Sequence, residues 1–307
     1  MKEISSGVWP VMTTPFTDDN KIDERALEAQ IEWYIAKGCD GLFAVCQSSE
    51  MYYLTLEERV KLASLSVKFA AKRLPVIAAG SLSTEFDEQR REMDALISTG
   101  IDAFVLLSNR FAKKEETDHV WTERVQRILD AYPEPQLGIY ECPHPYNRLL
   151  SLETLAWVVK TKRFGFIKDT CCNAETIKQR LGITNGSGVK LFNANTMTLL
   201  ESLKAGAAGF CGLMANLHPQ LYKWLIANHE KEPSKAEVCQ AMLTLLSNTE
   251  GQAYPVSAKQ HMVDEGIDMT LRCRCIDMDQ FKPKHLYMLR QAEKIEKKMY
   301  EMLGIAY

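Results

Sequence analysis

A lysine at the end of an apolar run is the residue of this sequence best suited to covalent chemistry. Lys168 follows the segment F-G-F-I (164–167), which is too hydrophobic for a strand on the surface. An amine in this place is expected to be largely removed from water, and desolvation disfavours its charged form. A neutral amine is the nucleophile that Schiff-base formation with a ketone requires. The alternative is a lysine that pairs with Asp169 or extends its amine to water.

Polar residues also stand at the ends of other apolar runs. Tyr140 is either a proton donor and acceptor or a core aromatic with a satisfied hydroxyl. Glu141 is either a base or a hydrogen-bond partner in the core, and Arg110 either binds an anionic substrate group or forms a salt bridge at the rim. Ser48 and Ser49 either contact a ligand or form the loop before a helix. The other polar candidates at the first two run ends are Thr13 and Gln47.

The apolar runs themselves number eight, and each is followed by a helical pattern. They are nearly continuous in apolar residues, as is typical of strands buried on both faces. A doubly wound open sheet is the alternative to a closed barrel, but no GxGxxG motif follows the first run and no GxxxxGK[ST] motif occurs. The runs cover residues 7–13, 40–46, 75–80, 101–108, 136–142, 164–169, 189–193 and 207–212.

Helices are predicted where apolar residues recur at three- and four-residue spacing, as in 24–37, 56–72, 84–98 and 117–132. The segment T-L-E-E (55–58) has the pattern of a capping box, and T-E-F-D (84–87) is a weaker version. Glycines follow several helices and precede the next strand by one to three residues. They are Gly38, Gly100 and Gly206.

Eight strands alternating with helices predict a (β/α)8 barrel, or TIM barrel, over residues 1–229, with the active site at the C-terminal ends of the strands. The candidates named above would meet there. After about residue 229 the strand pattern stops, and segments 234–249, 252–266 and 281–304 predict helices. We expect 230–307 to be a helical region packed on the barrel, or equally an oligomer interface.

Composition and charge exclude several classes of protein. The chain has 307 residues, 46% hydrophobic and 25% charged, and its 37 basic and 40 acidic side chains give a formal net charge of −3. This balance predicts no nucleic-acid partner and no membrane partner. The sequence has no apolar window long enough to span a bilayer and no apolar signal core, so we expect a cytoplasmic protein. The nine cysteines form no CxxC pair, so free thiols and no metal site are expected.

Taken in order, the segments from Gly7 to about Pro219 resemble the dihydrodipicolinate synthase and N-acetylneuraminate lyase family of class I aldolases. Each segment is weakly specific by itself, whereas the ordered set is strongly specific. Tyr140 and Lys168 are 28 positions apart (168 − 140), as expected for the catalytic pair of that family. The segments are G-V-W-P-V-M-T-T-P-F (7–16), C-Q-S-S-E (46–50), L-T-L-E-E-R (54–59), A-A-G-S-L-S-T (78–84), G-I-Y-E-C-P (138–143), F-I-K-D-T (166–170) and G-F-C-G-L-M-A-N-L-H-P (209–219).

The resemblance implies a lyase in which Lys168 attacks the C2 ketone of pyruvate or a related 2-keto acid. The resulting imine stabilises a carbanion at C3, which joins to an aldehyde or is released by cleavage of a carbon–carbon bond. Tyr140 would relay protons, and Ser48 and Ser49 with nearby backbone amides would hold the carboxylate. The resemblance implies no cofactor and no metal, and a homo-oligomer, either a tetramer of paired dimers or a dimer. The remaining candidates for substrate binding are Gln47, Thr13, Glu141, Arg110 and Cys211.

Two positions depart from the family pattern in the proton relay. Gln47 stands where the family has a hydroxyl, and a carboxamide is a poor proton carrier. Phe111 occupies the place of a tyrosine that the neighbouring subunit usually supplies. Either the relay uses water, Glu141 or Tyr146, or the reaction differs.

Further departures concern the second substrate. The arginine with which dihydrodipicolinate synthases bind its carboxylate falls near Pro145, and Arg148 is out of register. The loop N-A-N-T (193–196) lacks the acidic groups of sialic acid lyases. We therefore expect a lyase whose aldehyde substrate is unidentified. The alternatives are a catalytically weak protein that binds a keto acid as a sensor or structural element, and a hydratase or decarboxylase that acts through the same imine.

Overall fold

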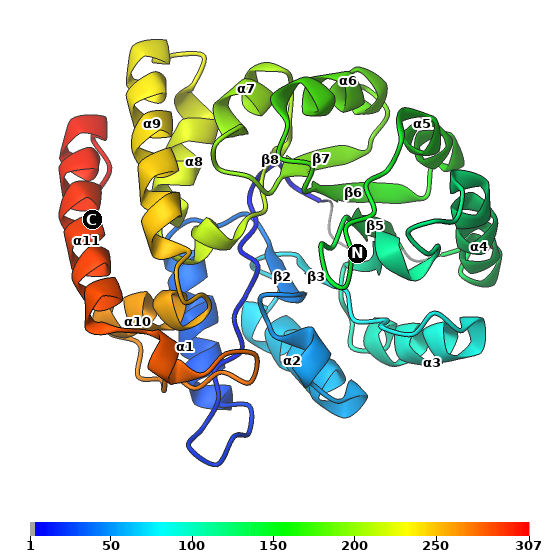
Figure 1. The fold of residues 1–307 in the computed structure, drawn as a ribbon, viewed down its shortest axis with the longest axis horizontal. Helices are drawn as coiled ribbons and strands as arrows, with labels where there is room; N and C mark the ends of the chain where they lie inside the picture. The colour runs from blue at the N-terminus through cyan, green and yellow to red at the C-terminus, as the bar shows by residue number, and fades with distance from the viewer. Residues whose placement is uncertain (1–3, 135, 307) are drawn as a thin grey trace.

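Eight parallel strands form one curled sheet in the computed structural model, which describes residues 4–134 and 136–306 (Figure 1). The strands follow the order β1-β8-β7-β6-β5-β4-β3-β2, so each strand lies beside its neighbour in the chain. All eight predicted strands are present, and the predicted (β/α)8 barrel is confirmed. Their bounds are β1 Gly7–Val8, β2 Leu42–Val45, β3 Val76–Ala78, β4 Ala103–Leu107, β5 Leu137–Tyr140, β6 Phe164–Asp169, β7 Lys190–Asn193 and β8 Gly209–Phe210.

The barrel closes between its first and second strands by a short bridge. β1 is shorter than the predicted run 7–13 because Pro10 has no N–H to donate to a neighbouring strand. Val11 pairs instead with Phe43 in an isolated parallel bridge, and the Met12 N–H donates to the Phe43 carbonyl oxygen at 3.1 Å. Strand pairing therefore continues around the ring, with one irregular step.

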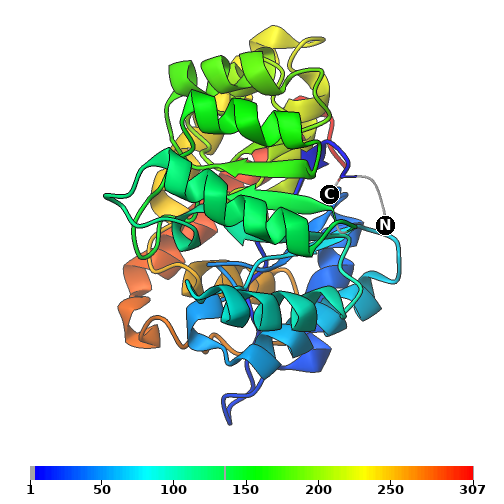
Figure 2. The same cartoon turned by 90° about the vertical axis from the view of Figure 1, so that its right-hand side faces the viewer.

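Helices form an outer layer around the strands, as the side view shows (Figure 2). The predicted capping box is confirmed: the Thr55 hydroxyl accepts from the Glu58 N–H, and the Glu58 carboxylate accepts from the Thr55 N–H. The cap predicted at Thr84 is wrong, because α3 begins at Phe86 without a side-chain cap. The helices are α1 Glu24–Ala36, α2 Leu56–Ala70, α3 Phe86–Ile97, α4 Asp118–Ala131, α5 Leu152–Thr161, α6 Ala174–Thr184, α7 Leu199–Lys204 and α8 Pro219–Asn228, with short 3-10 turns η1 Met51–Tyr53, η2 Ser108–Arg110, η3 Leu213–Asn216 and η4 Met278–Gln280.

Three further helices pack on one side of the barrel (Figure 1). They are α9 Pro233–Glu250, α10 Val256–Asp264 and α11 Pro283–Leu303, as the sequence predicted. α9 packs against α7, α8 and α11, and α10 packs against α11. In the part of the chain that the structure describes, no helix combines the length and the apolar character needed to cross a membrane.

Aromatic side chains fill the inside of the barrel beneath the strand ends. The rings of Phe166 and Phe192 stack with centroids 4.9 Å apart, and Trp9 lies 5.7 Å from Phe166. Phe43 meets Phe166 edge-on at 6.0 Å. We call these four residues the aromatic floor. Lys168 follows Phe166 by two residues on β6, so its side chain points to the same face and stands on this floor.

Candidate active site

Lys168 and Tyr140 lie side by side inside the barrel. They are directly opposite each other in the β5–β6 pairing, and the Lys168 Nζ is 4.2 Å from the centroid of the Tyr140 ring. The exposed fractions of these residues are 5% and 4%. Among the described residues, no carboxylate lies within ion-pair distance of this amine, since Asp169 pairs with Arg180 on the other face of the sheet. The amine is thus buried without a counter-ion beside a phenol.

The Tyr140 phenol is the group next to the amine that can supply a proton. Burial raises the pKa of Tyr140 well above its ordinary value, and the neighbouring Cys142 thiol adds to the rise. The phenol therefore stays protonated near neutral pH. Its hydroxyl lies 3.5 Å from the Gln47 Oε1, at the long limit of a hydrogen bond.

A cavity of about 630 Å³ opens above this pair. Gln47 and Ser48 from the loop after β2 line it together with Tyr140 and Lys168. This is the C-terminal end of the strands, where barrels of this class carry their chemistry. The structure thus brings four of the predicted site residues to one cavity.

The loop after β2 supplies polar groups around Cys46. Burial raises the pKa of the Cys46 thiol, whereas the Lys168 charge and hydrogen bonds from the backbone amides of Ser48 and Ser49 act in the opposite direction. The Ser49 hydroxyl is already engaged, because it accepts from the Cys46 N–H and donates to the Cys46 carbonyl oxygen, each at 2.8 Å. The Ser48 hydroxyl, which interacts with the Tyr254 phenol, and the amides of Ser48 and Ser49 are the groups of this loop that could bind a small anion.

Glu141 does not line this cavity. Its carboxylate lies behind the sheet, 2.9 Å from the Arg180 guanidinium, and accepts from the Leu150 N–H at 2.7 Å. Burial raises the pKa of Glu141 to about 7, the Arg180 charge opposes that rise, and Asp169 adds to it. Of the two roles that the sequence offered, base and core hydrogen-bond partner, Glu141 occupies the position of the second. The reason is the strand alternation, which turns residue 141 away from the face that carries Tyr140.

The other predicted contacts lie beneath or beside the cavity and not in its wall. The Thr13 hydroxyl accepts from the Gln30 amide at 2.8 Å and is buried. Cys211 is buried close to Lys168, and burial raises the pKa of its thiol to about 12. Arg110 lies against the Tyr52 ring, 5.4 Å from its centroid, and lines a separate cavity of about 580 Å³.

Comparison with known proteins agrees with this architecture. The model of the dihydrodipicolinate synthetase family matches residues 4–277. The chain belongs to this family. It is 31% identical over 222 residues to a 4-hydroxy-tetrahydrodipicolinate synthase of Acidiphilium cryptum and 29% identical over 216 residues to that of Agrobacterium fabrum, covering 70% of this chain and 72% of each relative.

Solved structures share the fold over almost the whole chain. The dihydrodipicolinate synthase of Acinetobacter baumannii, determined in complex with pyruvate, superposes with a TM-score of 0.82 over 99% of this chain and 100% of that one. Its sequence identity is 22%, so this likeness establishes the fold. The chain is thus a divergent member of the dihydrodipicolinate synthetase family.

In this member of the family, residues that the sequence did not single out complete the cavity. Tyr254, which precedes α10, lines it, and the Asn216 amide donates to the Tyr254 hydroxyl at 2.9 Å. Cys275 also lines it, and its N–H donates to the Glu50 carboxylate at 2.8 Å. The C-terminal region therefore supplies part of the wall. No periodic pattern marks these positions, because they lie between helices in loops.

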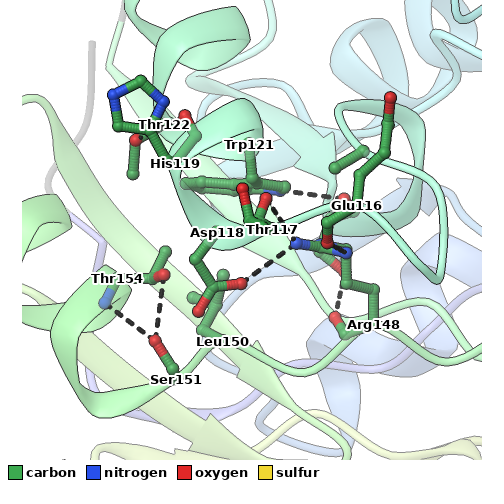
Figure 3. A network of polar contacts seen from close by, with 12 residues as sticks. Glu116, Thr117, Asp118, His119, Trp121, Thr122, Arg148, Leu150, Ser151 and Thr154 are labelled. Atoms are coloured by element: carbon green, nitrogen blue, oxygen red, sulfur yellow. Dashed lines mark hydrogen bonds and ion pairs between the residues drawn. The ribbon is translucent and has the colours of Figure 1, made fainter.

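Arg148, near the expected place of the family's substrate arginine, binds the segment that leads into α4 (Figure 3). It is 9% exposed and donates to the carbonyl oxygens of Lys113 at 2.7 Å and Glu116 at 3.0 Å. It also pairs with Asp118 at 3.0 Å. These contacts fix the segment that leads into α4, so the guanidinium is not directed at the cavity.

Phe111, at the expected place of the family's second tyrosine, is buried against Trp121 with ring centroids 6.4 Å apart. It offers no hydroxyl to the site. All nine cysteines are unpaired. Within residues 4–134 and 136–306, no group of three or more His, Cys, Asp or Glu side chains is arranged to hold a metal ion.

Proposed function

We propose that this protein is a lyase of the aldolase type that forms a Schiff base between Lys168 and pyruvate or a related 2-keto acid. The observation that carries the proposal is an amine that has no counter-ion in the described part of the chain. It is buried above the aromatic floor and 4.2 Å from the centroid of the Tyr140 ring, in a cavity large enough for two small molecules. Such an amine is poised to act as a nucleophile. Relatives that are named synthases add support for an enzyme.

The proposed reaction begins with attack of the Lys168 amine on the C2 ketone. Tyr140 then donates a proton to the hydroxyl of the carbinolamine, water leaves and an imine forms. Loss of a group or a proton from C3 gives an enamine, which is the nucleophile toward an aldehyde. The Ser48 hydroxyl, with the amides of Ser48 and Ser49, would hold the keto-acid carboxylate. Such oriented donors bind an anion well in a site removed from water.

We also infer that the second substrate carries no carboxylate. Lys168 and Glu50 are the charged side chains among the described residues that line the cavity, apart from the titratable His144. Glu50 is satisfied by the Cys275 N–H at 2.8 Å and the Lys259 amine at 3.5 Å. Arg110 lies against the Tyr52 ring and lines a different cavity. Among the cavity-lining residues that the structure describes, no cation therefore remains for a second anion, and tyrosines and amides favour an aromatic or hydroxylated aldehyde.

Trapping with borohydride tests the proposed function. The protein is incubated with pyruvate, reduced, digested and mapped by mass spectrometry, with the Lys168→Arg variant as control. We expect a reduced adduct on Lys168 in the wild type and none in the variant. Binding of pyruvate without an adduct would favour the sensor alternative. A set of aldehydes with and without a carboxylate then tests the second substrate, and turnover of pyruvate without any aldehyde would favour a hydratase or decarboxylase.

The sequence also predicts a homo-oligomer and a cytoplasmic location, and both stay predictions. Light scattering of the purified protein measures the first. Neither enters the chemistry proposed for Lys168, because every group invoked comes from one chain.

A further inference from the structure

A thiol lies between two phenols at the wall of the cavity. Cys142 is fully buried, and its Sγ is 3.4 Å from the Tyr52 hydroxyl and 3.5 Å from the Gln47 Oε1. It also interacts with the Tyr140 phenol and contributes to the raised pKa of that group. The Tyr140 hydroxyl also lies 3.5 Å from the Gln47 Oε1, so Tyr140 and Cys142 meet at the same amide oxygen and Cys142 continues to Tyr52.

The outer end of this line reaches the open part of the cavity. Tyr52 is half-buried and lines the cavity, and its hydroxyl donates to the His144 carbonyl oxygen at 2.7 Å. The His144 ring packs edge-on against Tyr52 with centroids 4.7 Å apart. Burial raises the pKa of Tyr52, whereas the adjacent Arg110 acts in the opposite direction by favouring the phenolate. Tyr52 is therefore held in place and has a cation beside its ring.

The other groups considered for proton transfer do not reach Tyr140. The Glu141 carboxylate lies behind the sheet with Arg180. The Tyr146 hydroxyl donates to the carbonyl oxygens of Asn109 at 2.7 Å and Ala112 at 2.9 Å, away from the cavity wall at Tyr140. The Gln47 Oε1 accepts hydrogen bonds but has no proton to give.

We propose that Cys142 and Tyr52 carry protons between Tyr140 and the solvent at the cavity mouth. Both act through Tyr140 and are therefore positioning residues for its proton. This inference rests on the proposed function, since it assigns them to the proton transfers of imine formation. It makes the relay of this chain internal to one subunit, with a thiol in the middle.

The proposed step balances in protons. When Tyr140 protonates the departing hydroxyl, water leaves and a phenolate remains. The Cys142 S–H gives its proton to that phenolate, and the Tyr52 O–H gives its proton to the thiolate. A solvent water protonates the Tyr52 oxygen, so the chain returns to its starting state with one proton taken from solvent. Only O–H and S–H bonds are made and broken, and no oxidant or reductant is required.

The test measures the rate of imine formation. Protein is mixed with pyruvate, quenched with borohydride at timed intervals and analysed by intact mass. Tyr52→Phe and Cys142→Ala are compared with Cys142→Ser, which keeps a proton-carrying group. The controls are Tyr287→Phe and Cys239→Ala, which lie on α11 and α9 outside the cavity. Thermal unfolding verifies that each variant is folded.

We expect Tyr52→Phe and Cys142→Ala to form the adduct roughly 10- to 100-fold more slowly, below the ~100- to 10,000-fold effect of a group that transfers the proton to substrate itself. Added imidazole buffer should restore part of that rate, which a structural defect would not show. Cys142→Ser should stay within about threefold of wild type, and pyruvate affinity should be unchanged.

The outcomes separate the two proposals. An adduct that forms at the wild-type rate in both Tyr52→Phe and Cys142→Ala would overturn the relay and leave the Schiff base standing. Slow variants that imidazole does not accelerate, with Cys142→Ser as slow as Cys142→Ala, would also overturn it. Absence of any adduct in the wild type would overturn the proposed function, and the relay with it.

Discussion

The two faces of strands β5 and β6 bury charge in opposite ways. On the inner face, Lys168 stands beside Tyr140, and no carboxylate of the described residues lies within ion-pair distance of its amine. On the outer face, one residue further along the chain in each case, Glu141 after the end of β5 and Asp169 at the end of β6 share the Arg180 guanidinium. Because successive side chains of a strand point to opposite faces, a shift of one residue separates the Lys168 amine from the ionic cluster of Glu141, Asp169 and Arg180.

This difference between the two faces indicates which buried charged groups are available to react with a ligand. The outer cluster satisfies its charges: Arg180 donates to both carboxylates and to the Leu150 carbonyl oxygen, and Glu141 accepts from the Leu150 N–H. Such a group holds the strand to the helix and is not available to a ligand. The inner amine lies against the Phe43 and Tyr140 rings and faces a cavity. An amine that faces a cavity can reach the carbonyl carbon of a bound ligand, and this is the property that a nucleophile needs.

Replacing the inner amine should give the largest effect. Lys168→Met removes the proposed nucleophile, so adduct formation should disappear and turnover should fall on the order of a million-fold, as when other covalent nucleophiles are removed. Urea unfolding should show equal or greater stability, because an unpaired buried amine is replaced by an apolar side chain. Turnover near the wild-type level in this variant would show that the inner amine is not the nucleophile.

Removing the phenol beside the amine should have the next largest effect. Tyr140→Phe keeps the ring against Lys168 and deletes the proton donor. We expect imine formation to slow by ~100- to 10,000-fold with little change in pyruvate affinity. Timed borohydride trapping measures the rate, and a normal rate in this variant would show that the proton comes from elsewhere.

A substitution in the ionic cluster of the outer face should change the free energy of unfolding. Arg180→Leu leaves Glu141 and Asp169 as two buried carboxylates without their cation, which should cost about 3–5 kcal/mol in the free energy of unfolding. Urea denaturation of this variant beside Lys168→Met provides the matched pair. Equal stability of the two variants would contradict the distinction between the faces.

Features of the fold and the site that depend on local sequence patterns could be predicted from the sequence. Features that depend on contacts between residues far apart in the sequence could not. The eight strands and the Lys168–Tyr140 pair were predictable, because buried strands are continuous apolar runs and strand ends converge in a barrel. The side of the sheet on which Glu141 falls was left open, since it depends on the register of one residue. Tyr254 and Cys275 gave no signal, because their place in the cavity wall is set by loops of the C-terminal region that contact the barrel over long sequence distances.

The smallest expected effect is the pH dependence of the outer cluster. The pKa of Glu141 is raised in the folded protein to about 7 from an ordinary 4.5. The folded state therefore binds the extra proton, and this stability is fully present below pH 4.5 and is lost as the pH rises through 7. The loss amounts to on the order of 3 kcal/mol. Urea midpoints between pH 4 and 8 should fall relative to Glu141→Gln, and parallel profiles would contradict the assignment.

The central claim is that the Lys168 amine bonds to the keto carbon of pyruvate within this cavity. A crystal structure of the protein with pyruvate tests it most directly. We predict continuous density from Lys168 Nζ to C2, with the carboxylate against the Ser48 hydroxyl and the amides of Ser48 and Ser49. Pyruvate seated with its C2 apart from that nitrogen, or joined to another lysine, would contradict the account.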